Sequence, residues 1–166
     1  GDGGGSRARR TGLTVIVLDA SAAIGLALGL PQANRIEQVA DDHDWVILAP
    51  QLLQIEVLQV LRRWVKAGNI SDREAQEALE LLDSLGIRHF DHDFLRDRVW
   101  ELKDNLTAHD ATYVALAESL SAPVLTTDKR LGNAPGNRAR VIRLLISCER
   151  RVGVWPSTSS EGAMAC

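Results

Sequence analysis

The stretch Thr14-Val-Ile-Val-Leu-Asp19 decides the fold class of this chain. Its four aliphatic residues form an apolar run of the length of a buried strand, and an aspartate closes the run. Similar short runs recur along the chain and alternate with segments of helical periodicity. This alternation predicts an α/β fold, in which helices flank both faces of a central parallel sheet.

The boundaries of these elements follow from the apolar spacing and from turn residues. The expected strands span residues 14–18, 45–49, 87–90, 124–126 and 140–144. The expected helices span residues 21–28, 32–42, 52–67, 72–85, 94–105 and 108–121. Ser71 and Thr107 each precede an acidic residue by three positions, which is typical of a capping box, and Gly68 and Gly86 follow helices.

Composition sets broad limits on the function. The 166 residues are 45% hydrophobic and 25% charged, which is ordinary for one globular domain, and no apolar run has the length of a membrane span. The formal net charge of -3 means that any nucleic-acid affinity must come from local patches or bound metal. Cys148 and Cys166 lie outside the apolar runs and neither build a zinc site nor staple the core, so a reducing cytoplasm fits best.

The two ends of the chain differ in composition from its middle. Residues 1–12 are rich in glycine and arginine without an apolar signal-peptide centre, and we expect a disordered or artificial tail. Residues 13–146 are the expected folded domain. Residues 147–166 include a polar, serine-rich tract and are expected to form a disordered tail. Because the only methionine is Met164, we expect that the chain does not begin at a natural start codon.

Four acidic residues stand where an α/β chain normally has apolar or small residues: Asp19, Glu56, Asp110 and Asp128. Two of them close expected strands, one opens a helix, and one lies a turn into a helix. Because the carboxyl ends of parallel strands share one edge of a sheet, we expect these side chains to converge there. Hard divalent cations, Mg²⁺ or Mn²⁺, are the natural partners of clustered carboxylates, and they activate water for phosphodiester hydrolysis.

Each acid alone also has a structural explanation. Asp19 could cap the helix that follows it, Asp128 could cap the turn after it, and Asp110 could belong to a capping box with Thr107. Glu56 is harder to explain, because it lies within an apolar helical stripe and needs a partner. The joint pattern of four acids favours the metal site over capping alone.

Four segments of the chain carry a family resemblance. They are Val15-Ile-Val-Leu-Asp-Ala-Ser21, Ile55-Glu56, Asn105-Leu-Thr-Ala-His-Asp-Ala-Thr-Tyr-Val-Ala-Leu-Ala-Glu118 and Leu125-Thr-Thr-Asp-Lys-Arg-Leu131. In order and context they resemble the successive motifs of PIN-domain ribonucleases, and most of all the VapC toxins of type II toxin-antitoxin systems. The resemblance covers about residues 15–144 and implies a single PIN-like domain.

The resemblance also implies an activity. It implies an endoribonuclease toxin that hydrolyses structured RNA, such as transfer or ribosomal RNA, with metal-activated water, leaving a 5′-phosphate and a 3′-hydroxyl. The catalytic and metal-binding residues, for Mg²⁺ or Mn²⁺, would be Asp19, Glu56, Asp110 and Asp128. By the same resemblance Ser21 and Thr127 orient ligands or waters. A cognate VapB-type antitoxin and a toxin homodimer are implied as well.

Candidates for RNA contact are fewer. Lys129 and Arg130 directly follow Asp128 and could hold a neighbouring phosphate, although a salt bridge to a carboxylate explains either residue about equally well. His109 stands where a tyrosine is common in the family. It could hydrogen-bond RNA or the antitoxin, while a plain surface role is the stronger expectation.

Other functional classes fit less well. A non-catalytic PIN-like module that binds RNA or protein is the main alternative, but it would have no need of four mutually repelling acids. The segment His89-Phe-Asp-His-Asp93 has donors for a transition metal, yet a solvated strand-to-helix loop explains it better. The sequence also lacks a glycine-rich phosphate-binding loop ahead of a helix.

Overall fold

A parallel sheet forms the centre of the computed structural model, which describes residues 14–144. The five strands of this sheet are β1 (Val15–Leu18), β2 (Val46–Pro50), β3 (Arg88–Phe90), β4 (Val124–Thr126) and β5 (Val141–Arg143). All neighbouring pairs are parallel, and the spatial order is β3-β2-β1-β4-β5. The predicted parallel α/β fold is therefore confirmed. The expected tails at 1–12 and 147–166, with both cysteines, lie outside the described residues.

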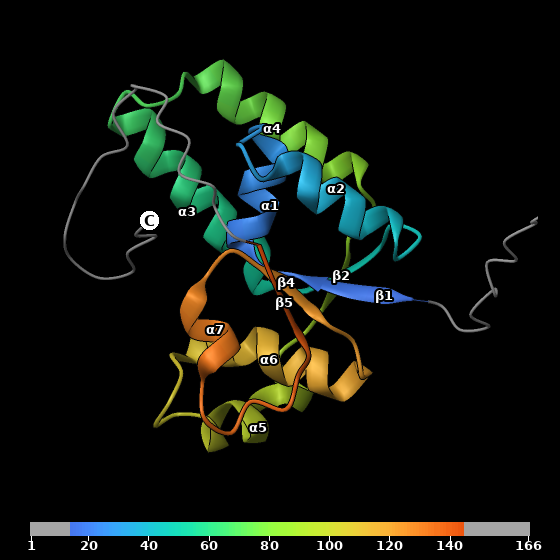
Figure 1. Ribbon diagram of the computed structural model, residues 1–166. Helices are drawn as coiled ribbons and strands as arrows, with labels where there is room; N and C mark the ends of the chain where they lie inside the picture. The colour runs from blue at the N-terminus through green and yellow to red at the C-terminus, as the bar shows by residue number, and fades with distance from the viewer. Residues whose placement is uncertain (1–13, 145–166) are drawn as a thin grey trace, which may run out of the picture.

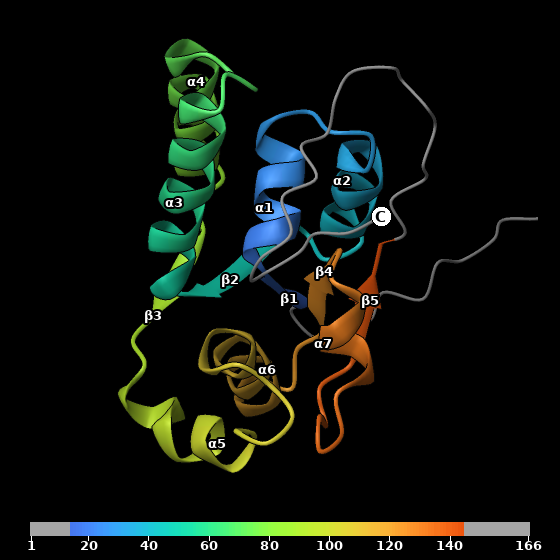
Figure 2. The ribbon, with the colours of Figure 1, turned by 90° about the vertical axis from the view of Figure 1, so that its left-hand side faces the viewer.

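Helices connect the strands. They are α1 (Ala20–Ala27), α2 (Ala33–Asp41), α3 (Leu52–Lys66), α4 (Asp72–Ser84), the 3-10 helix η1 (Asp93–Leu95), α5 (Arg96–Glu101), α6 (Ala108–Leu120) and α7 (Lys129–Asn133). Figures 1 and 2 show α1 to α4 on one side of the sheet and α5, α6 and α7 on the other. Within the described part of the chain, no helix has the length and apolarity needed to cross a bilayer.

Each face of the sheet has its own apolar core. Alternate residues of a strand point to opposite faces, so Ile16 and Leu18 of β1 pack with α1 to α4, whereas Val17 packs with α6. All three side chains are fully buried. Burial on both faces explains why the strands read as continuous apolar runs instead of alternating patterns.

The strand order creates a topological switch point between β1 and β4, in the middle of the sheet. The connections from β1 to β2 and from β2 to β3 pass on the side of α1 to α4, and the connection from β3 to β4 passes on the other side. β1 and β4 are therefore neighbours whose chains leave toward opposite faces. Ligands of open α/β sheets bind beyond the carboxyl ends of the strands at such a switch point.

Most helix ends agree with the predictions. Ser71 forms a complete capping box with Glu74, and Gly68 and Gly86 follow α3 and α4 at φ values of 73° and 62°, which glycine adopts readily. The single helix expected at 94–105 is instead η1 followed by α5, which ends at Glu101. The turns after it bury two leucines, Leu102 and Leu106, and this apolar burial outweighs helix propensity. The turn expected after Asp128 is the short helix α7.

Candidate active site

Asp19 lies at the switch point, directly after β1. Its Oδ1 accepts hydrogen bonds from the Ala22 N–H at 2.9 Å, which caps α1, and from the Ser21 hydroxyl at 2.7 Å. Its Oδ2 accepts a hydrogen bond from the hydroxyl of Thr126 at the end of β4. Asp19 therefore caps a helix and faces the neighbouring strand end at the same time.

Burial dominates the electrostatics of Asp19. The residue is only 6% exposed, and this desolvation raises the pKa of its carboxyl from 3.8 to about 6. Hydrogen bonds from Thr126, Ala22 and Ser21 act in the opposite direction, and the negative charge of Asp128 adds to the increase. A buried carboxylate of this kind is stabilised by a cation.

The hydroxyl that contacts Asp19 belongs to Thr126 and not to Thr127. Thr126 Oγ1 also accepts the Asp128 N–H at 2.9 Å and lies 3.5 Å from Ser21 Oγ. The sequence analysis expected Thr127 to orient ligands or waters, and this role stays a prediction. Among residues 14–144 its buried hydroxyl has no hydrogen-bond partner. Thr127 contributes its N–H, which donates to Ser21 Oγ at 3.0 Å. Thr126 is the last residue of β4 and Thr127 follows the strand, so the hydrogen bond to Asp19 comes from the strand residue.

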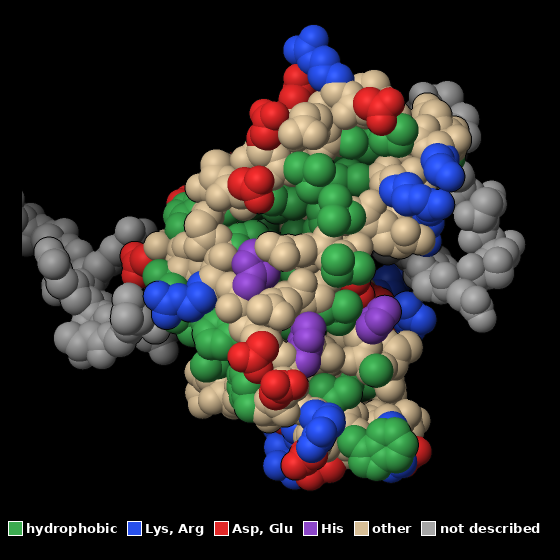
Figure 3. Space-filling model, turned by 180° about the vertical axis from the view of Figure 1, so that it is seen from behind, with side chains coloured by type: hydrophobic (Ala, Val, Ile, Leu, Met, Phe, Trp, Pro, Cys, Tyr) green, Lys and Arg blue, Asp and Glu red, His purple; other side chains and the backbone are tan. Residues whose placement is uncertain are grey.

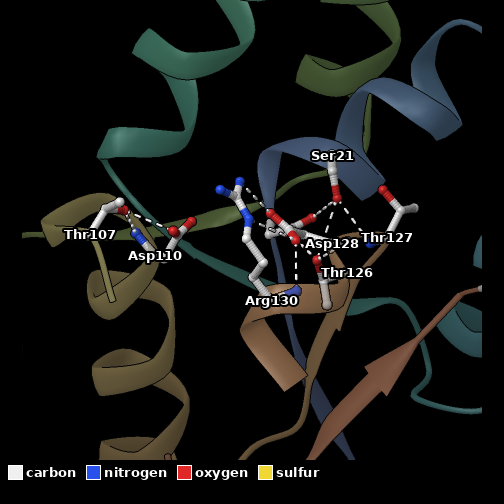
Figure 4. A network of polar contacts seen from close by, with 8 residues as sticks. Ser21, Thr107, Asp110, Thr126, Thr127, Asp128 and Arg130 are labelled. Carbon is white, nitrogen blue, oxygen red and sulfur yellow. Dashed lines mark hydrogen bonds and ion pairs between the residues drawn. The ribbon is translucent and has the colours of Figure 1, made fainter. Parts of the chain in front are cut away.

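Asp128 lies beside Asp19 and caps α7. Its Oδ1 accepts the Arg130 N–H at 2.8 Å, and its Oδ2 lies 3.2 Å from the Arg130 guanidinium. Figure 4 shows this guanidinium between Asp128 and Asp110, and both carboxylates contribute to the raised pKa of Arg130. The Arg130 guanidinium therefore already provides a positive charge beside these two acids. Lys129, the other predicted RNA contact on α7, is exposed.

Asp110 lies in the first turn of α6. Thr107 caps this helix, accepting the Asp110 N–H at 3.1 Å, and its hydroxyl lies 2.8 Å from Asp110 Oδ2. Asp110 therefore belongs to the capped first turn of α6. Figure 4 shows that its carboxylate is also directed toward Arg130.

Glu56, in the second turn of α3, contacts α6. Its Oε2 accepts a hydrogen bond of 2.6 Å from the buried Tyr113 hydroxyl, and its Oε1 lies 3.3 Å from His109 Nδ1. Burial raises the pKa of Glu56, the Tyr113 hydrogen bond and His109 oppose this increase, and Asp110 adds to it. The partner that the sequence required for Glu56 is therefore Tyr113, which the sequence analysis did not single out.

We call the four predicted acids the acidic site: Asp19, Glu56, Asp110 and Asp128. The structure couples them in two pairs. Asp128 raises the pKa of Asp19, and Asp110 raises the pKa of Glu56. Among residues 14–144, no three side chains of the His, Cys, Asp and Glu types stand close enough together to hold a metal ion in their present positions. The donors nevertheless fit Mg²⁺ or Mn²⁺, because they are hard oxygen ligands and two of them, Asp128 and Asp110, already interact with a guanidinium.

The second candidate metal segment, 89–93, takes part in ordinary backbone contacts. His92 Nε2 accepts the N–H of Leu52 at 3.2 Å, and Asp91 Oδ1 accepts the N–H of Asp93. The expectation of a solvated strand-to-helix connection agrees with these contacts.

Figure 3 shows basic side chains in separate groups interleaved with acids on one face of the molecule, so that face has no continuous basic patch.

Comparisons with known proteins agree with this geometry. The PIN domain model matches residues 16–137, a range that contains all four acids. Ribonuclease VapC1 of Mycobacterium tuberculosis is 45% identical over 89 residues, which cover 53% of this chain and 67% of VapC1. Ribonuclease VapC12 of the same species is 33% identical over 127 residues, which cover 76% of this chain and 97% of VapC12.

A solved structure shares the fold. The crystal structure of VapBC2 from Rickettsia felis, bound to a DNA fragment from their promoter, matches with a TM-score of 0.59 and 14% identity. The match covers 79% of this chain and 99% of that chain. The chain therefore belongs to the PIN domain family and, within it, to the VapC ribonuclease toxins.

Proposed function

We propose that this VapC ribonuclease cleaves RNA with Mg²⁺ or Mn²⁺ held by the acidic site. The observation that carries the proposal is Asp19, a buried carboxylate with a pKa of about 6 at the switch point of the sheet, with a second acid beside it. Such an arrangement is unfavourable without a cation and becomes favourable with one. Asp19 and Asp110 are the expected direct ligands, and Glu56 and Asp128 complete the site.

The residues of the chain have separate roles in this reaction. Thr126 and Ser21 fix the two oxygens of Asp19, so its free lone pairs have one orientation. Thr107 restrains Asp110 in the same way. The bound ion would supply an activated water and would stabilise the attacking and leaving oxygens of the phosphodiester. Hydrolysis would leave a 5′-phosphate and a 3′-hydroxyl.

RNA binding would use the cations around the acidic site. Arg130 pairs with Asp128, but its side chain is 61% exposed, so it can turn toward a phosphate when a metal takes its place among the acids. Lys129, next to Arg130 in sequence, is exposed, and so is His109 beside Glu56. We propose structured RNA, such as transfer or ribosomal RNA, as the substrate class.

A protein partner is also part of the proposal. The structural match named VapBC2 supports a VapB-type antitoxin for this chain. Next to Glu56 on α3, Ile55 and Leu58 are 65% and 49% exposed, and such apolar surface favours contact with a protein partner. A toxin homodimer and a cytoplasmic location complete the proposal.

Cleavage of total cellular RNA by purified, antitoxin-free protein tests the activity. We expect discrete fragments with Mn²⁺, and no fragments with chelator or with Asp19→Ala. End mapping would then identify the RNA and the chemistry of the new ends. Specific RNA binding without any metal-dependent cleavage would instead support the alternative, a non-catalytic PIN module.

A further inference from the structure

Tyr113 joins the acidic site to the core of the protein. Its ring is 3% exposed and packs in the core beneath α6, in the same cluster as Val17 of β1 and Leu48 of β2. Its hydroxyl leaves this core and donates to Glu56 Oε2 at 2.6 Å, which links α6 to α3 across 57 positions of sequence. One rigid side chain therefore connects the sheet, α6 and a site carboxylate.

The two partners of Glu56 differ in their rigidity. The side chain of His109 is 67% exposed, and the 3.3 Å separation from Glu56 Oε1 does not fix a flexible carboxylate strongly. Tyr113, by contrast, is held by close packing on all sides. The orientation of the Glu56 carboxylate is therefore set by Tyr113.

We propose that Tyr113 is a positioning residue for this ribonuclease, which holds Glu56 Oε2 and leaves Oε1, whose present neighbour is His109 Nδ1 at 3.3 Å, to bind a metal ion or its water. The inference rests on the proposed metal-dependent function. A phenol suits this role because it donates one hydrogen bond in a fixed direction. Burial and the neighbouring acids raise the pKa of Tyr113, so the donor proton stays in place at neutral pH.

Tyr113→Phe removes the hydroxyl and keeps the ring that fills the core. Calorimetric titration of the RNA-free protein with Mn²⁺ should give about tenfold weaker binding than wild type. On RNA, kcat should fall while KM for RNA stays the same, because Tyr113 does not contact the surface. The matched control is Thr112→Val, which removes a buried hydroxyl one position earlier on α6 that donates only to the Ala108 carbonyl at 2.7 Å. This control should bind Mn²⁺ like wild type.

A double-mutant cycle with Glu56→Gln separates positioning from a general loss of structure. If Tyr113 acts through Glu56, Tyr113→Phe should have little further effect on Mn²⁺ affinity in the Glu56→Gln background. Equal losses in both backgrounds, or unchanged affinity in Tyr113→Phe, would overturn the inference while metal-dependent function stands. If the wild-type protein binds no Mn²⁺, the proposed function itself fails and the inference fails with it.

Discussion

Thr126, at the end of β4, donates its hydroxyl proton to Asp19, at the end of β1, across 107 positions of sequence. The same oxygen accepts the Asp128 N–H, so one hydroxyl contacts two of the four acids. β1 and β4 are sheet neighbours at the switch point, and their pairing, Leu18 with Leu125, brings the two residues together. The acidic site therefore depends on the sheet register.

Thr126→Val should weaken the site, whereas Thr127→Val should not. Loss of a hydrogen bond to a charged group costs about 2 kcal/mol, and metal affinity should fall about tenfold because Asp19 loses its restraint. Thr127→Val removes a buried hydroxyl without a partner, so stability should stay the same or rise. Denaturant unfolding and Mn²⁺ titration of both variants provide the measurement. Equal effects of the two substitutions would refute the assignment of Thr126.

Asp19 should make the metal-free protein less stable as pH rises. Its folded pKa of about 6 exceeds the ordinary value of 3.8, so its contribution to stability is fully present below about pH 4 and is lost as pH rises through 6. A difference of this size corresponds to about 3 kcal/mol.

Asp19→Asn keeps a helix-capping side chain but cannot titrate. In chelator, this variant should gain roughly 2–3 kcal/mol in unfolding free energy relative to wild type between pH 4 and pH 7. Urea unfolding at several pH values measures the difference. If the unfolding free energies of the two proteins changed with pH in parallel, the Asp19 carboxyl would not have a raised pKa in the folded protein.

Divalent metal should raise the melting temperature of the wild-type protein. At one hundred times the dissociation constant, binding stabilises a protein by about 2.7 kcal/mol, which corresponds to roughly 5–10 °C for a domain of this size. Asp110→Asn should remove at least half of the increase. Asp97→Asn is the matched control, because Asp97 is an almost fully exposed acid on α5. Calorimetric melting of the three proteins with Mg²⁺ or Mn²⁺ tests this, and an equal increase in all of them would argue against the acidic site.

A second ion-pair system stabilises the fold away from the acidic site. Arg98 forms two contacts with Glu118, at 2.6 Å and 3.1 Å, and donates to the Gly136 carbonyl at 2.7 Å. Both side chains are largely buried. Arg98→Met should destabilise the protein by about 2 kcal/mol, because Glu118 would lose its charged partner and keep the hydrogen bond from the Arg138 N–H.

The Arg98 substitution should leave metal affinity unchanged, since Glu118 lies eight positions after Asp110 on α6, a distance of about 12 Å along the helix. Urea unfolding and Mn²⁺ titration give the two readouts. A large loss of metal affinity in Arg98→Met would mean that global stability, and not local geometry, controls the site.

Local sequence patterns were sufficient to predict the sheet, and they singled out four acids whose shared metal site stays a prediction. The five strands begin and end within one residue of their expected bounds, because each is a short apolar run between clear turn signals. Asp19 and Asp128 were recognisable because a charge that closes a buried strand is unusual. The sequence could not distinguish capping from metal binding, and the structure shows that Asp19 and Asp128 both cap helices.

Contacts between distant segments could not be predicted in the same way. The contact of Thr126 with Asp19 depends on how β4 pairs with β1, and the contact of Tyr113 with Glu56 depends on how α6 lies against α3. The signal was present, because Tyr113 follows Asp110 by one helical turn and lies on the same side of α6. The sequence alone did not show that this side of α6 faces Glu56 on α3, because that contact depends on how the two helices lie across the sheet.

Anomalous scattering from a crystal saturated with Mn²⁺ tests the central claim most directly. We predict a strong peak that touches the carboxylates of Asp19 and Asp110, with Arg130 turned away from Asp128. Absence of a peak among the four acids at saturating Mn²⁺, or a peak elsewhere on the molecule, would contradict the assignment of the acidic site as the metal centre of this ribonuclease.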